Sequence, residues 1–349
     1  MRIIKFIFSA KTVVLSIIVA LSACSDYLDI MPDDVATMDH AFSNREISKK
    51  FLFTCYSYLP NPVSLDNNPA LQGGDEMWWC STTSGNGLNY FNKNAGYLAM
   101  GRQSANDPYL NYWDGGRNGT NLFIALRDCN IFLENIHLPT DIDEWERLQW
   151  IAEVKFLKAY YHFYLFRNYG PIPIIRENIP VNAAEEARMY RKPVDDVVNY
   201  IVELIDEAIP DLMPNPSNTR VEDAGRITQP IAAALKAEAL TWAASPLLNG
   251  SEQESPTFSL IDNQEVQLFP QQYDSSKWTR AVQAIKEAIE VCQTNGHHLY
   301  SYQNVNASIA MSDITKLKCT LRGAVTEKYN PEIVWPSTYS TSCKQIAFI

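Results

Sequence analysis

Residues 151–168, with the sequence IAEVKFLKAYYHFYLFRN, decide the fold of this chain. Apolar side chains recur there every three or four residues, which places them on one face of an α-helix. They are Ile151, Val154, Leu157, Tyr161 and Leu165, and a second row of Phe156, Tyr160, Phe163 and Phe166 widens the stripe. A stripe of this width predicts a helix that is buried on most of its sides. Gly170-Pro171 ends it, because glycine permits a left-handed cap and proline cannot continue a helix.

Five further segments also indicate helices. Two are expected at 48–58 and 121–136, a third begins after Pro193 and ends near Pro210, and a fourth is the alanine-rich segment 231–248. The last is marked by four residues at spacings of three and four, Ala281, Ile285, Ala288 and Cys292. No stretch alternates apolar and polar residues as a half-buried strand would.

The arrangement of small and large side chains on these helices resembles a tetratricopeptide repeat. Alanines on segment 231–248 let a neighbouring helix approach closely, and Trp278 and Ala281 follow on the next helix. The spacing differs from the standard repeat because long insertions intervene at 171–192 and 250–277. The sequence therefore predicts a mainly α fold of tetratricopeptide-like helical pairs with long irregular insertions. Periodicity alone leaves a generic helical bundle as the alternative.

The composition excludes several classes of protein. The 349 residues are 46% hydrophobic and 20% charged, which is typical of a folded chain rather than a disordered one. Lys and Arg total 29 against 40 Asp and Glu, and the net charge of -11 argues against a nucleic-acid partner. No cysteine pair has CxxC spacing, and the adjacent His297 and His298 diverge on regular structure, so neither a metal nor a cofactor is expected. Cys129 and Cys292 fall on apolar helical faces, where packing is their expected role.

The first residues have the features of an export signal. Three basic residues precede an apolar run at 13–21, which is too short to span a bilayer because that takes about 20 apolar residues. Leu21-Ser22-Ala23-Cys24 then resembles the cleavage site of a bacterial lipoprotein, at which Cys24 would receive lipid chains, palmitate among them. We expect 1–23 to be a lipoprotein signal peptide and 24–40 a lipidated tether. A plain secretory signal with a chance cysteine is the alternative.

Residues 73–116 form a loop-rich window with an excess of glycine and aromatic residues. The window contains eight of the 14 glycines and eight aromatic side chains, interleaved with amide, carboxylate and guanidinium groups. Such a surface suits a sugar, whose C–H face stacks on a ring and whose hydroxyls form hydrogen bonds; one stack is worth about 1 kcal/mol, by analogy with aromatic pairs. The candidate ligand-binding residues are Asp75, Glu76, Trp78, Trp79, Tyr90, Arg102, Tyr112 and Trp113. The alternative is that these rings hold an irregular loop against the helices.

Several short motifs follow one another along almost the whole chain after residue 23. They are 24–29 with Pro32, Gly74-Asp75-Glu76, Tyr112-Trp113, 130–136, 152–163 with 167–173, Gly225-Arg226-Ile227-Thr228, 244–247, 278–281 and 330–335. In this order they resemble the RagB/SusD family of outer-membrane nutrient-uptake lipoproteins. The last motif looks like the strand that follows the repeats in that family. Residues 167–170 look structural, as a helix end that is packed by rings.

The resemblance implies what the protein does and where. Family members are helical proteins held by a lipid anchor at the surface of Gram-negative cells, where they cap a SusC-like TonB-dependent transporter. They capture glycans or other nutrients for it and carry out no chemistry. For this chain the resemblance implies a SusD-like helical domain over 41–335 and an atypical tail over 336–349, with the family's C-terminal region missing. The binding residues vary among members, so the window residues are not transferred from the family.

Two other functions remain open. A helical-repeat adaptor would bind only protein, through the concave face of the helical pairs. A helical glycoside hydrolase would need two carboxylates about 5–9 Å apart across the scissile bond, whereas Asp75 and Glu76 are neighbours that point apart. No GxSxG, HExxH or phosphate-binding glycine loop occurs. The sequence therefore favours a binding protein over an enzyme.

Overall fold

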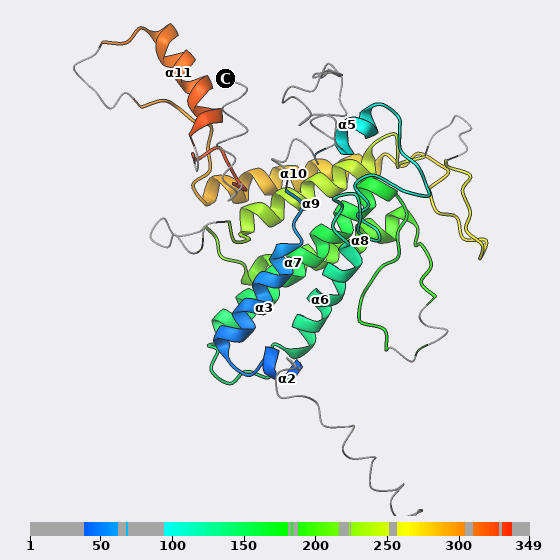
Figure 1. The fold of residues 1–349 in the computed structure, drawn as a ribbon. Helices are drawn as coiled ribbons and strands as arrows, with labels where there is room; N and C mark the ends of the chain where they lie inside the picture. Colours follow the sequence, from blue (N-terminus) through cyan, green and yellow to red (C-terminus); the bar gives the residue numbers. More distant parts are fainter. Residues whose placement is uncertain are drawn as a thin grey trace, which may run out of the picture.

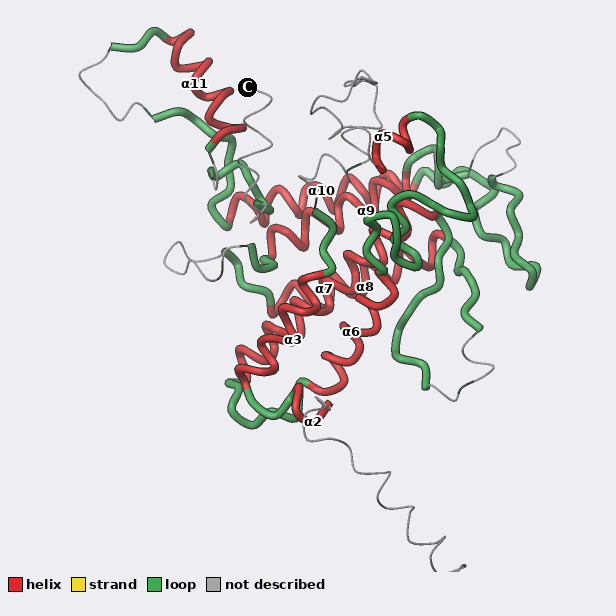
Figure 2. Tube along the Cα trace, viewed as in Figure 1, coloured by secondary structure: helices red, strands yellow, loops and turns green. Residues whose placement is uncertain are grey.

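The computed structural model describes residues 38–61, 68, 94–180, 183, 188–215, 223, 225–250, 257–303, 310–327 and 330–336. Its elements are α2 (Met38–Ala41), α3 (Arg45–Ser57), α5 (Asn94–Ala99), α6 (Leu122–Asn135), α7 (Glu144–Tyr169), α8 (Val194–Ala208), the short 3-10 helix η2 (Ile209–Asp211), α9 (Gln229–Ala244), α10 (Ser276–Thr294) and α11 (Asp313–Thr326). The described residues form no strand, only three isolated bridges (Figures 1 and 2). None of the described helices is both long and apolar enough to cross a membrane. The expectation of a mainly α fold is confirmed.

Consecutive long helices pack against each other in chain order. α6 contacts α7, α7 contacts α8, α8 contacts α9 and α9 contacts α10, while α3 packs on both α6 and α7 (Figure 1). This succession of the pairs α7–α8 and α9–α10 is the tetratricopeptide-like stacking that the alanine-rich helix predicts. Irregular loops separate the helices where the sequence has its long insertions (Figure 2).

The central helix is α7, which contacts α3, α6, α8 and α9. It begins at Glu144 rather than at Ile151, because Glu144 and Glu146 favour a helix N-terminus electrostatically although they add nothing to the apolar stripe. It ends at Tyr169, and the cap residue Gly170 has a φ of 69°, which glycine adopts without a Cβ penalty. Most of its side chains are buried, as the wide stripe predicts.

Local side-chain chemistry explains the ends of the other helices. Asn44 and Asn121 stand directly before α3 and α6, and each side-chain oxygen accepts hydrogen bonds from backbone N–H groups of the first turn. α9 ends at Ala244, before the expected Leu248, because Pro246 disfavours the helical conformation at the residue that precedes it.

Alanine allows α9 and α10 to approach closely. The residues of α10 that are buried are Ala281, Ala284 and Ala288. The row of four that marks this helix in the sequence is therefore only partly the buried row: Ile285 is 38% exposed, and Cys292, which was expected to pack, is only half-buried. The reason is that the row facing α9 is made of small residues, which leaves the larger apolar side chains of α10 outside the contact.

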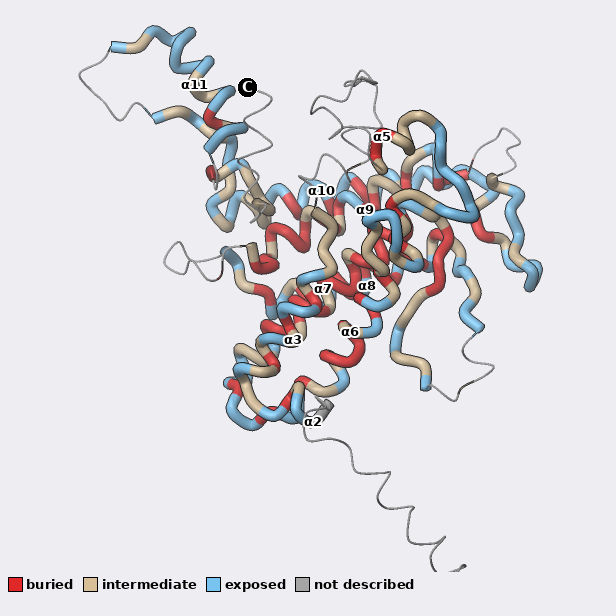
Figure 3. The backbone as a smooth tube through the Cα atoms, in the orientation of Figure 1, coloured by how far each residue is buried: buried red, intermediate tan, exposed pale blue. Residues whose placement is uncertain are grey.

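The core is continuous from α2 to α10 (Figure 3). At its lower end Phe42, Phe51 and Phe132 form a cluster with ring centroids 5.2–6.3 Å apart. Cys129 is fully buried among these helices, which confirms its packing role. The cysteines within the described residues are all free thiols: Cys55, Cys129, Cys292 and Cys319.

A buried polar network links α7 to α3 and to the segment before α9. The carboxylate of Glu153 is fully buried and accepts hydrogen bonds from Tyr56 Oη at 2.5 Å, Gln149 Nε2 at 2.9 Å and Arg226 Nη2 at 2.6 Å. Arg226 also donates to Asp223 at 3.1 Å. Burial raises the pKa of Glu153, and the facing guanidinium opposes that shift. Because each oxygen of Glu153 has a partner, the network joins three segments that are far apart in sequence.

A second buried group fixes the chain after α7. His162 is fully buried; its Nδ1 lies 2.7 Å from the carbonyl oxygen of Lys158, and its Nε2 accepts from the N–H of Ile175 at 3.1 Å. Lys158 Nζ donates to the carbonyl oxygen of Arg176 at 2.6 Å. Burial lowers the pKa of His162 to about 3 and that of Lys158 to about 8. These bonds hold the extended segment 171–176 along α7.

The C-terminal part differs from the expectation. Residues 330–335 form a turn rather than a strand, because the side chain of Asn330 donates to the carbonyls at the end of α11 and accepts from the N–H of Glu332. The segment nevertheless packs on the body: the ring of Trp335 lies 5.7 Å from Phe156 and 5.3 Å from Tyr160. The sequence did not predict α5 or α11.

Candidate ligand-binding surfaces

Three of the predicted ligand-binding residues lie in the described part of the chain. They are Arg102, Tyr112 and Trp113, which follow α5 and lie before α6. The others lie outside the described residues, as does the expected lipid-bearing Cys24: Asp75, Glu76, Trp78, Trp79 and Tyr90. The structure therefore places only the second half of the aromatic window.

Tyr112 is a packing residue. It is 4% exposed, and its ring meets that of Tyr164 on α7 edge-on at 4.8 Å. Its backbone N–H donates to Tyr169 Oη at 2.9 Å. Burial raises the pKa of Tyr112. In this structure the ring packs as the alternative describes, holding the loop to the helices, and contact of Tyr112 with a ligand stays a prediction.

Trp113 has a similar supporting position. Its indole is half-buried and meets Phe123 at 4.8 Å and Tyr169 at 5.4 Å, both edge-on, while the guanidinium of Arg191 lies 5.6 Å from its ring. These contacts join the loop to α6, to the end of α7 and to the segment before α8. The same helix end is packed by Arg167, whose guanidinium lies 4.9 Å from the ring of Tyr164. The expectation that residues 167–170 are structural is confirmed.

Arg102 belongs to an exposed cluster of two tyrosines and two arginines. The guanidinium of Arg102 lies 5.3 Å from the ring of Tyr97, that ring lies 5.1 Å from the ring of Tyr109, and the guanidinium of Arg117 lies 5.3 Å from Tyr109. Both arginines are exposed and both tyrosines are half-buried. We call these four residues the tyrosine–arginine platform.

Hydrogen bonds fix the loop that forms the platform. The side chain of Gln103 bridges to Tyr109, accepting from its N–H at 2.8 Å and donating to its carbonyl oxygen at 3.1 Å. Arg117 pairs with Asp107, and this partner lowers the pKa of the Asp107 carboxyl. A Cβ on Gly119 would lie 2.3 Å from the backbone of Asn111, so only glycine fits there. These contacts support Tyr109 and Arg117 of the platform from within its own loop.

The platform has the chemistry that a hydroxyl-rich ligand needs. Arg102 has no carboxylate partner among the described residues, so its N–H donors face solvent. The ring of Tyr97 lies beside those donors. Within the described residues no group of three or more His, Cys, Asp or Glu side chains could hold a metal ion. The arrangement favours recognition by stacking and hydrogen bonds.

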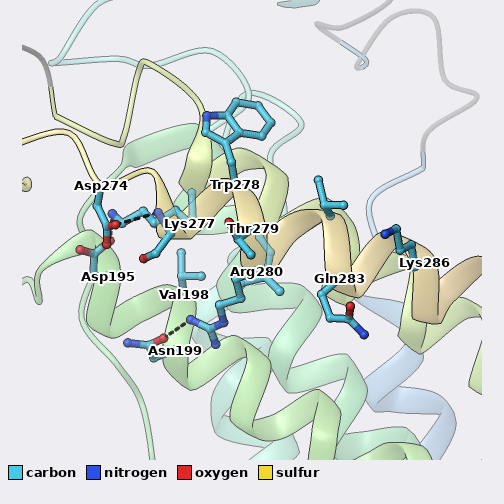
Figure 4. Close-up of a pocket in the computed structure, with 14 residues that line it drawn as sticks. Asp195, Val198, Asn199, Asp274, Lys277, Trp278, Thr279, Arg280, Gln283 and Lys286 are labelled. Carbon is cyan, nitrogen blue, oxygen red and sulfur yellow. Dashed lines mark hydrogen bonds and ion pairs between the residues drawn. The ribbon is translucent and has the colours of Figure 1, made fainter.

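A groove of about 960 Å³ lies between α8 and the first turns of α10, over the end of α9 (Figure 4). Its floor includes the buried side chains of Val198 and Leu240. Its rim is polar: Lys277 Nζ pairs with Asp195 at 2.5 Å (Figure 4). The pattern of the sequence indicates helix packing for Trp278 and Ala281 but does not predict this groove, because its walls come from three helices that only the fold brings together.

Some polar groups of the groove bind one another. Arg280 reaches from α10 to α8 and donates to Asn199 Oδ1 at 2.7 Å, beside the Lys277–Asp195 pair (Figure 4). Asp274 accepts from the N–H of Ser276 at 2.8 Å at the start of α10, which helps to lower its pKa. The platform combines the rings of Tyr97 and Tyr109 with the guanidinium of Arg102, which is the combination that stacking on a sugar needs. We therefore take the platform as the candidate ligand-binding surface.

Comparison with known proteins decides the family. The model of a SusD-like family, described as starch-binding and associating with the outer membrane, matches residues 26–239. The chain belongs to the SusD-like family. The resemblance to RagB/SusD proteins that the sequence motifs indicate is thereby confirmed. The match includes the aromatic window, the platform and the helices from α3 to most of α9.

The chain is also similar to solved structures. BT4246 is similar to 85% of this SusD-like chain, with 28% sequence identity and a TM-score of 0.67. Its selenomethionine form is similar to 78% of the chain at 27% identity and a TM-score of 0.59. A SusD-like protein from Bacteroides fragilis is 18% identical over 78% of the chain, with a TM-score of 0.49. The chain spans about half the length of these structures, 51%, 45% and 42% respectively. No curated protein matches the sequence.

Proposed function

We propose that this SusD-like protein is a non-enzymatic glycan-binding lipoprotein of the outer-membrane surface, which captures glycans for a SusC-like TonB-dependent transporter. The observation that supports it most is the family match over 26–239, since that family is described as starch-binding and associated with the outer membrane. The lipoprotein-like motif that ends at Cys24 agrees with this location. In this proposal Cys24 bears the lipid, and residues 24–40 tether the helical body to the membrane.

The tyrosine–arginine platform forms part of the glycan site in this proposal. A sugar ring that replaces the Arg102 guanidinium on the face of Tyr97 leaves Arg102 free to donate hydrogen bonds to the sugar hydroxyls. One stacked ring contributes about 1 kcal/mol, which is roughly 5-fold in affinity, so several contacts are required. The remaining window residues supply them in this proposal, and Trp78 and Trp79 offer the largest ring faces.

A titration with malto-oligosaccharides tests the site. These starch fragments are the first probe because the family description names starch; a glycan array extends the search to other neutral glycans. Replacing Tyr97 by Ala is expected to weaken binding roughly 5-fold, since it removes one stacking face. Arg102→Ala is expected to weaken it by a similar factor. Unchanged circular dichroism shows that the fold is retained.

A matched control is available on α7. Trp145 is 60% exposed and lies outside the platform, so Trp145→Ala is expected to leave the affinity unchanged. Trp78→Ala and Trp79→Ala are expected to weaken binding without unfolding the protein. Loss of the fold in those two variants would favour a packing role for the tryptophans. Full affinity in Tyr97→Ala and Arg102→Ala would remove the platform from the site.

A further inference from the structure

Two buried cysteines meet where α3 packs on α6. Cys55 is the last residue of the buried stripe of α3, after Ser48 and Leu52, and Cys129 lies on the buried face of α6. Both cysteine side chains are fully buried, and the two helices are in contact (Figure 1). Small side chains at a helix crossing let the two backbones approach, so the fold brings together two thiols that are far apart in sequence.

Hydrogen bonds next to the cysteines fix how the helices meet. Tyr58, one turn after Cys55, donates from its Oη to Asp128 Oδ2 at 2.6 Å, and Asp128 directly precedes Cys129. Tyr161 Oη of α7 donates to the carbonyl oxygen of Cys55. The position of α3 on α6 is therefore set close to the two cysteines, by bonds that involve neither sulfur.

The two thiols are neighbours in the core. The Cys129 thiol lies within hydrogen-bond range of the Cys55 thiol; burial raises the pKa of Cys129, and this contact raises it further. Burial also raises the pKa of Tyr161, and the nearby thiols of Cys129 and Cys55 are the next two causes of that shift. Disulfides form between side chains that already meet, since a larger separation requires the backbone to move.

The reduced pair is unreactive once the protein has folded. The thiolate is the form that attacks a disulfide, and burial holds Cys129 in its protonated form. Both side chains are fully buried, so a reagent in solution does not reach either sulfur. Oxidation of the pair therefore has to take place before α3 packs on α6, while the chain is folding. A disulfide formed at that stage is enclosed in the core.

We propose that Cys55 and Cys129 form a disulfide that joins α3 to α6 as the chain folds after export. Disulfides form and persist outside the cytoplasm, so this inference rests on the export that is part of the proposed function. The oxidant is a disulfide, of a protein or of a small molecule. The thiolate of one cysteine attacks it to give a mixed disulfide, and the thiolate of the other cysteine then attacks the sulfur of the first. The new S–S bond forms, that of the oxidant breaks, and the oxidant leaves as two thiols with the electrons and protons that the cysteines lose.

The disulfide encloses the candidate ligand-binding surface in a closed loop. The chain between Cys55 and Cys129 contains the aromatic window at 73–116 and the whole tyrosine–arginine platform. Closing so long a loop restricts the unfolded chain strongly, which favours the folded form. The other described cysteines, Cys292 on α10 and Cys319 on α11, are half-buried on other helices, and burial is the cause that raises the pKa of Cys292.

Refolding of the purified chain from residue 25 onward tests the pair without reference to location. The reduced, denatured protein is refolded in a mixture of reduced and oxidised glutathione, alkylated, and mapped by mass spectrometry without reduction. The expected result is a linked pair of peptides that holds Cys55 and Cys129, with Cys292 and Cys319 alkylated. Dithiothreitol is expected to leave the link intact in the folded product and to break it in urea, because both sulfurs are buried.

Thermal unfolding measures what the bond contributes. The oxidised wild type is expected to unfold about 5 °C or more above the reduced wild type. Cys55→Ala and Cys129→Ala are each expected to abolish this difference. Cys292→Ala is the matched control, since it removes a half-buried thiol of α10, and it is expected to keep the difference. If an alanine variant fails to fold, the peptide map of the wild type still decides.

Two results of the refolding experiment would overturn the proposal. One is alkylation of both Cys55 and Cys129 after refolding with oxidised glutathione, and the other is a link from either of them to a different cysteine. Protein purified from cells gives a second arm. The linked pair in the membrane fraction supports the proposal, and free Cys55 and Cys129 there overturn it although the membrane location stands. Protein that remains in the cytosol with its leader intact contradicts the export in the proposed function, whatever the refolded chain shows.

Discussion

Glu153 and His162 are two fully buried ionisable groups of α7, and they differ in whether the surrounding residues can stabilise a charge on them. Glu153 is surrounded by donors from Tyr56, Gln149 and Arg226, so a charge can be held there. His162 is bonded only to backbone groups and lies near Lys158, so its charged form has no counter-ion. The stability of the fold therefore depends on Arg226 as the partner of Glu153, and it depends on pH through His162.

Arg226→Met is expected to destabilise the protein by about 3–5 kcal/mol, because it leaves the carboxylate of Glu153 buried without its counter-charge. Chemical denaturation with urea measures the change. The matched control is Lys155→Met, on the same helix. Lys155 pairs with Glu207 at 2.7 Å, but both side chains are partly exposed, so the expected loss is at most about 1 kcal/mol. Equal losses for the two variants would contradict the role given to the buried network.

The pH dependence of stability follows from His162. Its pKa is lowered from 6.5 to about 3 in the folded protein because burial disfavours the imidazolium form. Between these values the unfolded chain binds a proton that the folded chain does not, so the free energy of unfolding falls as the pH falls. From pH 7 to pH 5 the contribution is about 2 kcal/mol. His162→Gln is expected to remove that part of the slope, whatever its effect on stability at pH 7. An unchanged slope would mean that other groups account for it.

At the scale of elements, the end of α7 depends on one glycine. Gly170 has φ 69° and ψ -121°, which lies outside the left-handed helical region that asparagine tolerates. A Cβ there would also meet Phe269 at 3.4 Å. Gly170→Ala and Gly170→Asn are therefore both expected to lower stability by about 1 kcal/mol or more. Thermal unfolding measures this, with Lys155→Ala as a partly exposed control on the same helix. Wild-type stability in Gly170→Asn would contradict this prediction.

The helices could be predicted from the sequence where their apolar faces are buried. On α7, α8 and α9 the spacing of apolar residues marks helices that bury their apolar face. The prolines before α8 and after α9 mark where α8 begins and where α9 ends. The spacing fails for α10, since Ile285 belongs to the apolar row that faces solvent and not to the alanine row that faces α9. For 330–335 the family resemblance implied a strand, and the hydrogen bonds of Asn330 favour a turn.

The candidate surface could be predicted only in part. Composition located the aromatic window, and Arg102 does lie in an exposed cluster with Tyr97 and Tyr109. Composition could not distinguish rings that support the loop from exposed rings, because the burial of each ring depends on whether α6 and α7 lie beneath it. Tyr112 and Trp113 lie over those helices and are therefore packing residues. Their place directly before α6, on a short loop, was the signal available in the sequence.

At the scale of the whole molecule, the proposed function requires a membrane partner. Purification of the lipidated protein from cells is expected to bring with it a large β-barrel transporter, because a protein that captures nutrients without chemistry must hand them on. Cys24→Ser is expected to release the protein from the membrane fraction, since it removes the site of lipid attachment. A protein that remains in the cytosol with its leader intact would contradict this part of the proposal.

The most direct test of the central claim combines binding with product analysis. The chain from residue 24 is titrated with a panel of neutral oligosaccharides, beginning with malto-oligosaccharides, and the ligand recovered from the complex is analysed by mass spectrometry. The account predicts saturable binding that Tyr97→Ala weakens, with the oligosaccharide recovered intact. Release of reducing sugar that is lost in Glu76→Gln, or an absence of binding across the whole panel, would contradict it.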